Sequence, residues 1–189
     1  RDIEQRWQTF KMNIMKTLLS LLLIITFSNV IIAQTTAIPD ANFEQVLISW
    51  GLDFGPIDGS VFTANIDTVT ALNLLSANIS DLTGIEDFTA LSILNCESNQ
   101  LTSLDMSQNL QLTELRCADN DLTYLDVSSN LSLTYLFCKK NLLGNLDVSQ
   151  NTQLVTLLCE RNLLTSLDVS QNINLTDLSC HINQLPSLD

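Results

Sequence analysis

The chain has little of the chemistry on which enzymes depend. Its 189 residues include five glycines, three prolines and a single histidine, His181. It contains no glycine-rich phosphate loop and no nucleophile elbow, and no carboxylate pair falls in a cleft that the sequence defines, so no catalytic constellation is visible. Cys180 precedes His181, but neighbouring residues of a strand point to opposite faces, which excludes a cysteine–histidine dyad. We therefore predict a protein that is not an enzyme and needs no cofactor.

Positive charge is scarce as well, with eight basic residues against twenty-one acidic ones. Half of the basic residues lie before residue 34. The rest of the chain has four basic and nineteen acidic residues, hence a net charge of −15. Such a surface repels phosphate backbones and anionic lipid. We therefore expect no nucleic-acid partner.

The first 33 residues differ in character from the rest. Residues 1–14 show no apolar pattern, and we expect them to be unstructured sequence upstream of, or at the start of, a leader. Lys16 then precedes an apolar run that ends at Ala33. This order is typical of a secretory signal peptide over 15–33. A membrane anchor is the weaker alternative, because polar residues interrupt the run and it is shorter than about 20 apolar residues. We expect a secreted or cell-surface protein with no stable membrane insertion after cleavage.

From Leu91 onward a unit of 21 residues repeats without insertion or deletion. Each unit reads Leu-x-x-Leu-x-Cys-x-x-Asn-x-Leu-x-x-Leu-Asp-Val-Ser-x-Asn-x-x, with few departures. A fixed period of this length indicates a solenoid whose coils stack on one another. The cysteine position recurs as Cys96, Cys117, Cys138, Cys159 and Cys180, and the asparagine that follows it as Asn99, Asn120, Asn141, Asn162 and Asn183.

The unit contains Leu-x-x-Leu-x-apolar-x-x-Asn twice, which predicts two short parallel strands in each coil. A helix and its connections would not fit in the roughly 12 residues after the first strand. Alternation directs Leu115 and Cys117 inward and Arg116 outward. We therefore predict a mostly β solenoid over 69–189, made of one divergent 22-residue coil, four full coils and one truncated coil, which suggests that the chain is a fragment.

Residues 34–68 lack the repeat, and we expect them to cap the first coil. Asp40 is suited to begin a helix whose apolar face runs from Phe43 to Trp50, and Gly51 is suited to end it. About 35 residues are too few for an independent core. We therefore predict a small N-terminal helical cap in place of a separate domain.

The 21-residue pattern resembles the leucine-rich repeat. The form that ends in Leu-Asp-Val-Ser-x-Asn is similar to the repeats of secreted bacterial proteins of the internalin-like type, and IPDANFEQVLISWGLD is similar to the helical cap that precedes those repeats. The resemblance extends over nearly all of residues 38–189. It implies a leucine-rich-repeat solenoid that recognises proteins outside the cell, often in adhesion, although this fold serves many functions.

Three rows of identical residues have simple structural interpretations. We expect the cysteines to pack as small apolar side chains, since their number is odd and a line of thiols does not give zinc a tetrahedral site. We expect the asparagines after the first strand to satisfy the backbone of the turns. The aspartates of the Leu-Asp-Val-Ser segment would accept hydrogen bonds from the following serine, and calcium bridging stays as the alternative.

The positions that the repeat leaves variable predict the binding surface. All four basic residues after residue 34 lie on or directly after the first strand, in three successive coils, together with two aromatic residues. This composition is typical of an interface hot spot, whereas simple cross-strand packing is the alternative. The predicted partner-binding residues are Arg116, Tyr135, Phe137, Lys139, Lys140, Leu158, Glu160 and Arg161.

The sequence thus favours a non-enzymatic binding or adhesion module that recognises a protein partner through the sheet of first strands. A glycan-binding or matrix-binding role is the first alternative, because exposed aromatic rings also stack on sugars. The targeting portion of a larger exported enzyme is the second.

Overall fold

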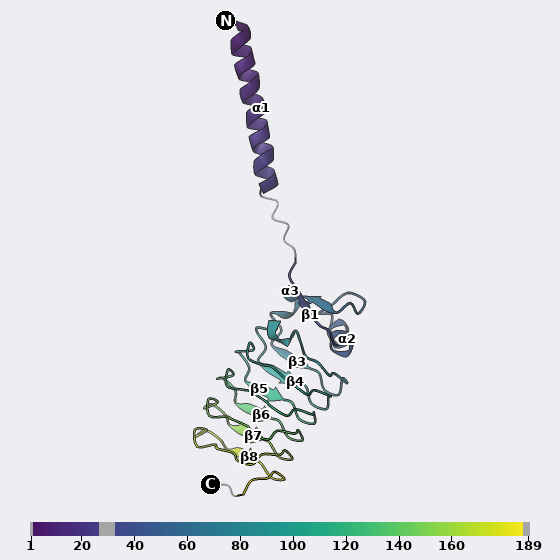
Figure 1. The fold of residues 1–189 in the computed structure, drawn as a ribbon, viewed down its shortest axis with the longest axis vertical. Helices are drawn as coiled ribbons and strands as arrows, with labels where there is room; N and C mark the ends of the chain where they lie inside the picture. The colour runs from purple at the N-terminus through teal and green to yellow at the C-terminus, as the bar shows by residue number, and fades with distance from the viewer. Residues whose placement is uncertain (1, 27–32, 187–189) are drawn as a thin grey trace. The chain divides into compact units, whose positions relative to one another are not determined.

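A computed structural model describes residues 2–26 and 33–186, which belong to two compact units that divide at residue 33. The described part of the first unit is one helix, α1 (Asp2–Thr26), shown in Figure 1. The expectation that residues 1–14 are unstructured is therefore wrong. This stretch has no glycine or proline and is rich in residues that tolerate a helix.

Over the described ranges, no helix is both long and apolar enough to cross a membrane. The predicted signal segment lies partly in α1, and its residues 27–32 lie outside the described residues.

The second unit is the mostly β solenoid that the repeat predicts. Six strands form one parallel sheet in chain order, and two more form a separate antiparallel pair near its start (Figure 1). The elements in order are β1 (Thr35–Ala37), α2 (Ala41–Ser49), β2 (Ser60–Phe62), α3 (Thr63–Ile66), β3 (Ala71–Asn73), the 3-10 helix η1 (Ile85–Asp87), β4 (Ile93–Asn95), β5 (Glu114–Arg116), β6 (Tyr135–Phe137), β7 (Thr156–Leu158) and β8 (Asp177–Ser179).

Each coil has one strand, and the prediction of two is wrong. In the second half of the coils that the structure describes, the strand ladder is reduced to a single parallel bridge between Asp105 and Asp126. Side chains there take the hydrogen bonds that a ladder would otherwise make. Ser128 N, for example, donates to Asp126 Oδ1 at 2.9 Å, which turns the chain away from an extended course. The apolar pattern therefore identified the inward residues of this half correctly but not its backbone conformation.

The core is a continuous column between the two halves of the coils. The inward residues of the first strands, such as Leu115 and Cys117, are fully buried, and so are those of the second halves, such as Leu122 and Val127. Each fully buried leucine or valine contributes about 1.5–3 kcal/mol relative to an exposed one. The same positions recur in every coil, so the neighbours on each side supply most of the contacts that stabilise a given coil.

Helix α2 and the β1–β2 pair form the predicted cap. Asp40 begins α2, and its Oδ1 accepts hydrogen bonds from the N–H groups of Asn42 and Phe43 at 2.9 and 3.1 Å. Its other oxygen, Oδ2, accepts from Ser80 N at 2.8 Å and from Asp81 N at 3.1 Å, in the turn of the first coil. One carboxylate therefore ties the cap helix to the solenoid.

Two further contacts hold the cap. The carboxylate of Glu44 is buried and accepts from the N–H groups of Asp58 and Gly59 at 2.7 and 2.9 Å, which fixes the turn before β2. Gly84 has a φ of +100°, and a Cβ there would lie 2.5 Å from the carbonyl oxygen of Ala37. Only glycine allows the first coil to approach β1 so closely.

Candidate functional site

The candidate site is the surface formed by the outward side chains of β3–β8 and the residues directly after them, which we call the first-strand face. Its floor is the row of five cysteines, all of them free and buried. Burial raises the pKa of Cys96 and of Cys159 to about 12, because an apolar environment disfavours the thiolate. The thiols are therefore protonated and act as small apolar side chains beneath the face.

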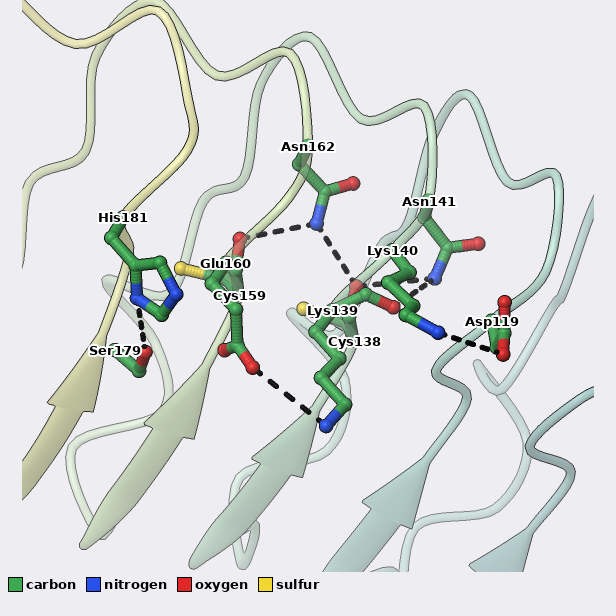
Figure 2. Close-up of polar contacts among 10 residues, drawn as sticks. All are labelled: Asp119, Cys138, Lys139, Lys140, Asn141, Cys159, Glu160, Asn162, Ser179 and His181. Atoms are coloured by element: carbon green, nitrogen blue, oxygen red, sulfur yellow. Dashed lines mark hydrogen bonds and ion pairs between the residues drawn. The ribbon is translucent and has the colours of Figure 1, made fainter.

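The asparagines that follow the cysteines hold successive coils together. Asn162 Nδ2 donates to the carbonyl oxygens of Cys138 and Cys159 at 3.0 and 3.1 Å, so one amide joins two coils (Figure 2). Its Oδ1 accepts from Leu143 N in the preceding coil at 3.1 Å. Asn120 and Asn141 make the same set of bonds. The turn at this edge of the face is therefore rigid.

A second row of asparagines, which the sequence interpretation did not assign, lies in the other half of the coils. Asn130 Nδ2 donates to the carbonyl oxygens of Met106 and Asn109, both at 3.0 Å. In contrast to the first row, its Oδ1 is buried with no hydrogen-bond partner among the described residues. The same holds for Asn109, Asn151 and Asn172. The nested Leu-x-x-Leu-x-apolar-x-x-Asn pattern is the signal that could have identified this row.

Between each cysteine and its asparagine the backbone enters the left-handed region. The residues there are not glycines, and their φ angles lie between 51° and 58°, at Ser98, Asp119, Lys140, Arg161 and Ile182. This conformation costs about 1–2 kcal/mol for an ordinary L residue. The amide bonds of the first asparagine row hold the turn in place, and the turn directs Lys140 and Arg161 to the edge of the first-strand face.

Arg116 lies at the centre of an ionic and aromatic cluster. Its Nε donates to Glu114 Oε1 on the same strand, and its Nη1 lies 4.0 Å from Glu97 Oε1 of the preceding coil. Its guanidinium carbon is 5.0 Å from the centre of the Tyr135 ring on the next strand. Burial raises the pKa of Glu97, an effect that the charges of Arg116 and Lys139 oppose.

The two lysines are paired across coils in the same way. Lys139 Nζ lies 3.8 Å from Glu160 Oε1, and Lys140 Nζ lies 3.2 Å from Asp119 Oδ2 (Figure 2). Lys139 also covers the Phe137 ring at 4.4 Å from its centre. Arg161 is exposed, and its backbone N–H donates to the carbonyl oxygen of His181.

The structure brings the predicted binding residues onto one face, but not all of them are accessible. Strand register places Arg116 beside Phe137 and Phe137 beside Leu158. Phe137 is only 9% exposed, because Lys139 covers its ring and Tyr135 meets it edge-on. Phe137 therefore offers little surface to a partner, and its assignment as a partner-binding residue stays a prediction. Tyr135, Lys139, Leu158 and Glu160 are half-buried, and Lys140 and Arg161 are exposed.

Sequence reasoning missed a hollow at the end of the face next to the cap. Trp50 follows α2 and is 47% exposed, although the helix pattern assigned it to the buried side. Together with side chains of β3, β4 and β5 it lines a hollow of about 240 Å³. The lining residues include Trp50, Leu72, Asn73, Ile93, Asn95, Glu114 and Arg116. The repeat alone does not predict this hollow, because one of its walls is Trp50 of the cap.

The aspartates of the second half form an exposed row on another surface. The Ser107 N–H and hydroxyl lower the pKa of Asp105, and the corresponding serines lower the pKa of Asp126, Asp147 and Asp168. Hydrogen bonds from the turn therefore stabilise these carboxylates as anions. Within the described ranges, no group of three or more histidine, cysteine, aspartate or glutamate side chains is placed to hold a metal ion.

Comparison with known proteins relates these features to solved structures. No known protein-family model matches the chain. Over 71 residues, 38% of the chain, it is 44% identical to internalin J of Listeria monocytogenes serotype 4b (strain F2365). The solved functional domain of InlJ from Listeria monocytogenes, which includes a cysteine ladder, is 42% identical with a TM-score of 0.75 over 83% of the chain.

Two other solved structures share the fold at lower identity. An internalin, InlF of Listeria monocytogenes strain 4b F2365, has a TM-score of 0.72 at 23% identity, over 80% of this chain and 46% of that one. The Leptospira interrogans protein LIC12759, a leucine-rich-repeat protein, has a TM-score of 0.61 at 22% identity, over 67% of this chain and 35% of that one.

The matches extend over only part of each relative. The chain spans 8% of internalin J and 36% of the solved InlJ domain. Within that part, the stacked coils, the helical cap and the buried row of cysteines are all present. The chain is therefore an internalin-like leucine-rich-repeat protein.

Proposed function

We propose that the chain is a non-catalytic binding module, secreted or held at the cell surface, that docks a protein partner on the first-strand face. The observation that carries the proposal is the distribution of charge. All four basic residues of the second unit lie on this face, in a unit whose net charge is −15. Four carboxylates match them over β4–β7, namely Glu97, Glu114, Asp119 and Glu160. Over β4–β7 the face is thus a balanced patch on an acidic protein.

A patch with balanced charge and an aromatic residue is better suited to bind a protein surface than a polyanion. Charged pairs that are already formed can exchange with charges on a partner at little cost in desolvation, and this favours specificity over raw affinity. Tyr135 and Leu158 supply half-buried apolar surface between the pairs, which is the typical composition of an interface centre. The rigid turn that holds Lys140 and Arg161 also limits the entropy lost on binding.

Charge reversal at the edge of the face tests the proposal. The variant Lys140→Glu/Arg161→Glu should weaken binding to a purified extracellular protein partner at least tenfold in biolayer interferometry. A matched control is Tyr124→Ala, since Tyr124 is 65% exposed in the second half of its coil, away from the face. Equal affinities for the two variants would contradict a role for this face.

We also propose that residues 15–33 act as a secretory signal peptide that is removed on export. Lys16 before an apolar run that ends at Ala33 supports this assignment. N-terminal sequencing of the exported protein should give a first residue at or near Gln34. A mature protein that still begins before Lys16 would reject it.

A further inference from the structure

The hollow between the cap and the first strands has features that neither the repeat nor the docking face explains. Its apolar side is formed by Trp50 and Ile93, which are 47% and 39% exposed. Large apolar side chains that stay accessible inside a hollow are a common mark of a ligand site. Its volume of about 240 Å³ lies below the ~300–1,000 Å³ of pockets for drug-sized molecules. The hollow is therefore sized for a single small ring.

The polar side of the hollow is rich in hydrogen-bond donors. Asn73 and Asn95 lie side by side on β3 and β4, and Arg116 follows in the same row on β5. The Oδ1 of Asn73 accepts from Leu75 N at 3.2 Å, and the Oδ1 of Asn95 accepts from Glu97 N at 3.1 Å. These bonds fix the orientation of both amides. Among the described residues, their Nδ2 groups make no hydrogen bond to the protein, so four N–H donors remain available.

The charge of the hollow is balanced, which narrows the ligand class. Arg116 is already paired with Glu114 and lies near Glu97, so it does not present an uncompensated positive charge. An anionic ligand would also meet the net negative charge of the unit. The ligand should therefore be neutral, offer several oxygen acceptors, and carry an apolar face that an indole can cover.

We propose that this hollow binds one neutral sugar ring. The ring would place its C–H face against the Trp50 indole and its hydroxyl oxygens toward the Nδ2 groups of Asn73 and Asn95. A sugar hydroxyl can also donate to the carboxylate of Glu114. For a ligand of about a dozen heavy atoms at the efficiency of drug-sized compounds, these contacts correspond to a dissociation constant on the order of 1 mM. Several rings of one glycan, or several copies of the protein, would bind more tightly through avidity.

Ligand-detected saturation-transfer NMR on the full chain tests the proposal. The neutral probes are methyl α-mannoside, methyl β-galactoside and N-acetylglucosamine, and the charged probes are N-acetylneuraminic acid and choline. At least one neutral probe should bind with a dissociation constant of about 1 mM, and the charged probes should bind at least tenfold more weakly. No neutral binding, or preferential binding of a charged probe, overturns the assignment.

Variants locate the binding to the hollow. Trp50→Ala should remove the signal of the neutral probe, whereas Phe54→Ala should not, since Phe54 is an equally aromatic, 81% exposed residue of the cap that does not line the hollow. Asn95→Asp keeps the acceptor that binds Glu97 N and removes the two donors, so it should weaken binding at least fivefold even if Trp50→Ala fails to fold. Unchanged binding in folded Trp50→Ala or Asn95→Asp overturns the proposal, and Lys140→Glu/Arg161→Glu should leave sugar binding intact.

Discussion

The two halves of each coil are built from nearly the same nine-residue pattern, yet only the first half forms a sheet. Both halves end in an asparagine whose Nδ2 donates to two carbonyl oxygens of stacked coils, as in Asn141 and Asn151. In the first half Asn141 Oδ1 also accepts a backbone N–H from the preceding coil, at 3.0 Å from Leu122 N. In the second half Asn151 Oδ1 is buried without a partner among the described residues.

This difference shows how one pattern gives two local structures. In the first half, the strand ladder and the asparagine amides together satisfy the hydrogen-bonding groups of the backbone. These bonds also hold the left-handed turn in place despite its backbone strain. In the second half, Asp147 Oδ1 accepts from Ser149 N at 2.9 Å and replaces the ladder with a turn. The sheet half is thus the rigid platform that can carry a binding face, and the other half closes the coil.

The largest expected effect comes from removing one asparagine from each half. Asn141→Ala leaves a buried N–H and several carbonyl oxygens unpaired, and should lower the free energy of unfolding by about 3 kcal/mol. Asn151→Ala loses two hydrogen bonds and also removes a partnerless oxygen, so its cost should be roughly half as large. Urea unfolding followed by circular dichroism measures both. Equal losses would show that the extra acceptor bond of the first row contributes nothing.

Thiol labelling can compare the opening of the two halves. Cys138 and Val148 occupy equivalent inward positions and are both fully buried. In Val148→Cys, the new thiol should react with a disulfide reagent several-fold faster than Cys138, because a half without a ladder opens at lower free energy. Mass spectrometry of the labelled peptides identifies the site. Cys180, at 7% exposure, should be the first of the native cysteines to react.

Low pH should act on the second half first. The Ser128 N–H and hydroxyl lower the pKa of Asp126 below its ordinary value. A carboxylate with a depressed folded-state pKa stabilises the fold above its unfolded-state pKa, and the contribution is lost as pH falls through the folded value, below about pH 4. Hydrogen exchange at pH 3 should therefore show lower protection in the second halves, whereas the first halves, held by amides that do not titrate, should keep theirs.

A companion variant isolates the serine. Ser128→Ala removes the hydroxyl bond but keeps the backbone N–H, so the pKa of Asp126 should rise part of the way to its ordinary value in an NMR titration. An unchanged pKa would indicate that the hydroxyl does not bind the carboxylate in solution.

The smallest expected effect concerns the left-handed residues other than glycine, which among the described coils occur in the first half. Arg161 has a φ of +58°, and asparagine tolerates this region better than other non-glycine residues. Arg161→Asn should raise the free energy of unfolding by about 0.5 kcal/mol. Thr165→Asn, at an exposed second-half position without a positive φ, should leave it nearly unchanged. If both variants raised the free energy of unfolding equally, the gain would not come from relief of backbone strain at Arg161.

The sequence predicted the fold class well because the repeat acts at the level of packing. A period of 21 residues with leucine, cysteine and valine at inward positions leaves few arrangements other than a stack, and the register Leu115–Leu136–Leu157 is the one that the period requires. The cap helix was equally predictable from the sequence, since Asp40 at its start is a strong signal for a helix N-terminus. The absence of a second strand was not predictable. The alternation of apolar and polar residues indicates which side chains are buried, but not whether their backbones form a strand ladder.

The candidate site was predictable only in outline. Position in the repeat placed Arg116, Tyr135 and Lys139 on one face, but it could not show that the cations pair with carboxylates of neighbouring coils. Phe137 is buried by Lys139, a contact between residues of the same coil whose geometry depends on the left-handed turn that follows. The hollow at Trp50 joins repeat positions of β3–β5 to a cap residue that lies outside the repeat, so the period alone does not identify it.

The asparagine rows also set a rule for how this molecule can change length. The Nδ2 group of each of these asparagines donates to a carbonyl oxygen of the coil before it. If one whole period were gained or lost, an equivalent asparagine would therefore make the same hydrogen bond. A change of any other size would bring leucines opposite amides and place polar groups in the column. In evolution or in design, the solenoid should therefore grow and shrink in whole periods, and the proposed binding surface should lengthen by three strand residues each time.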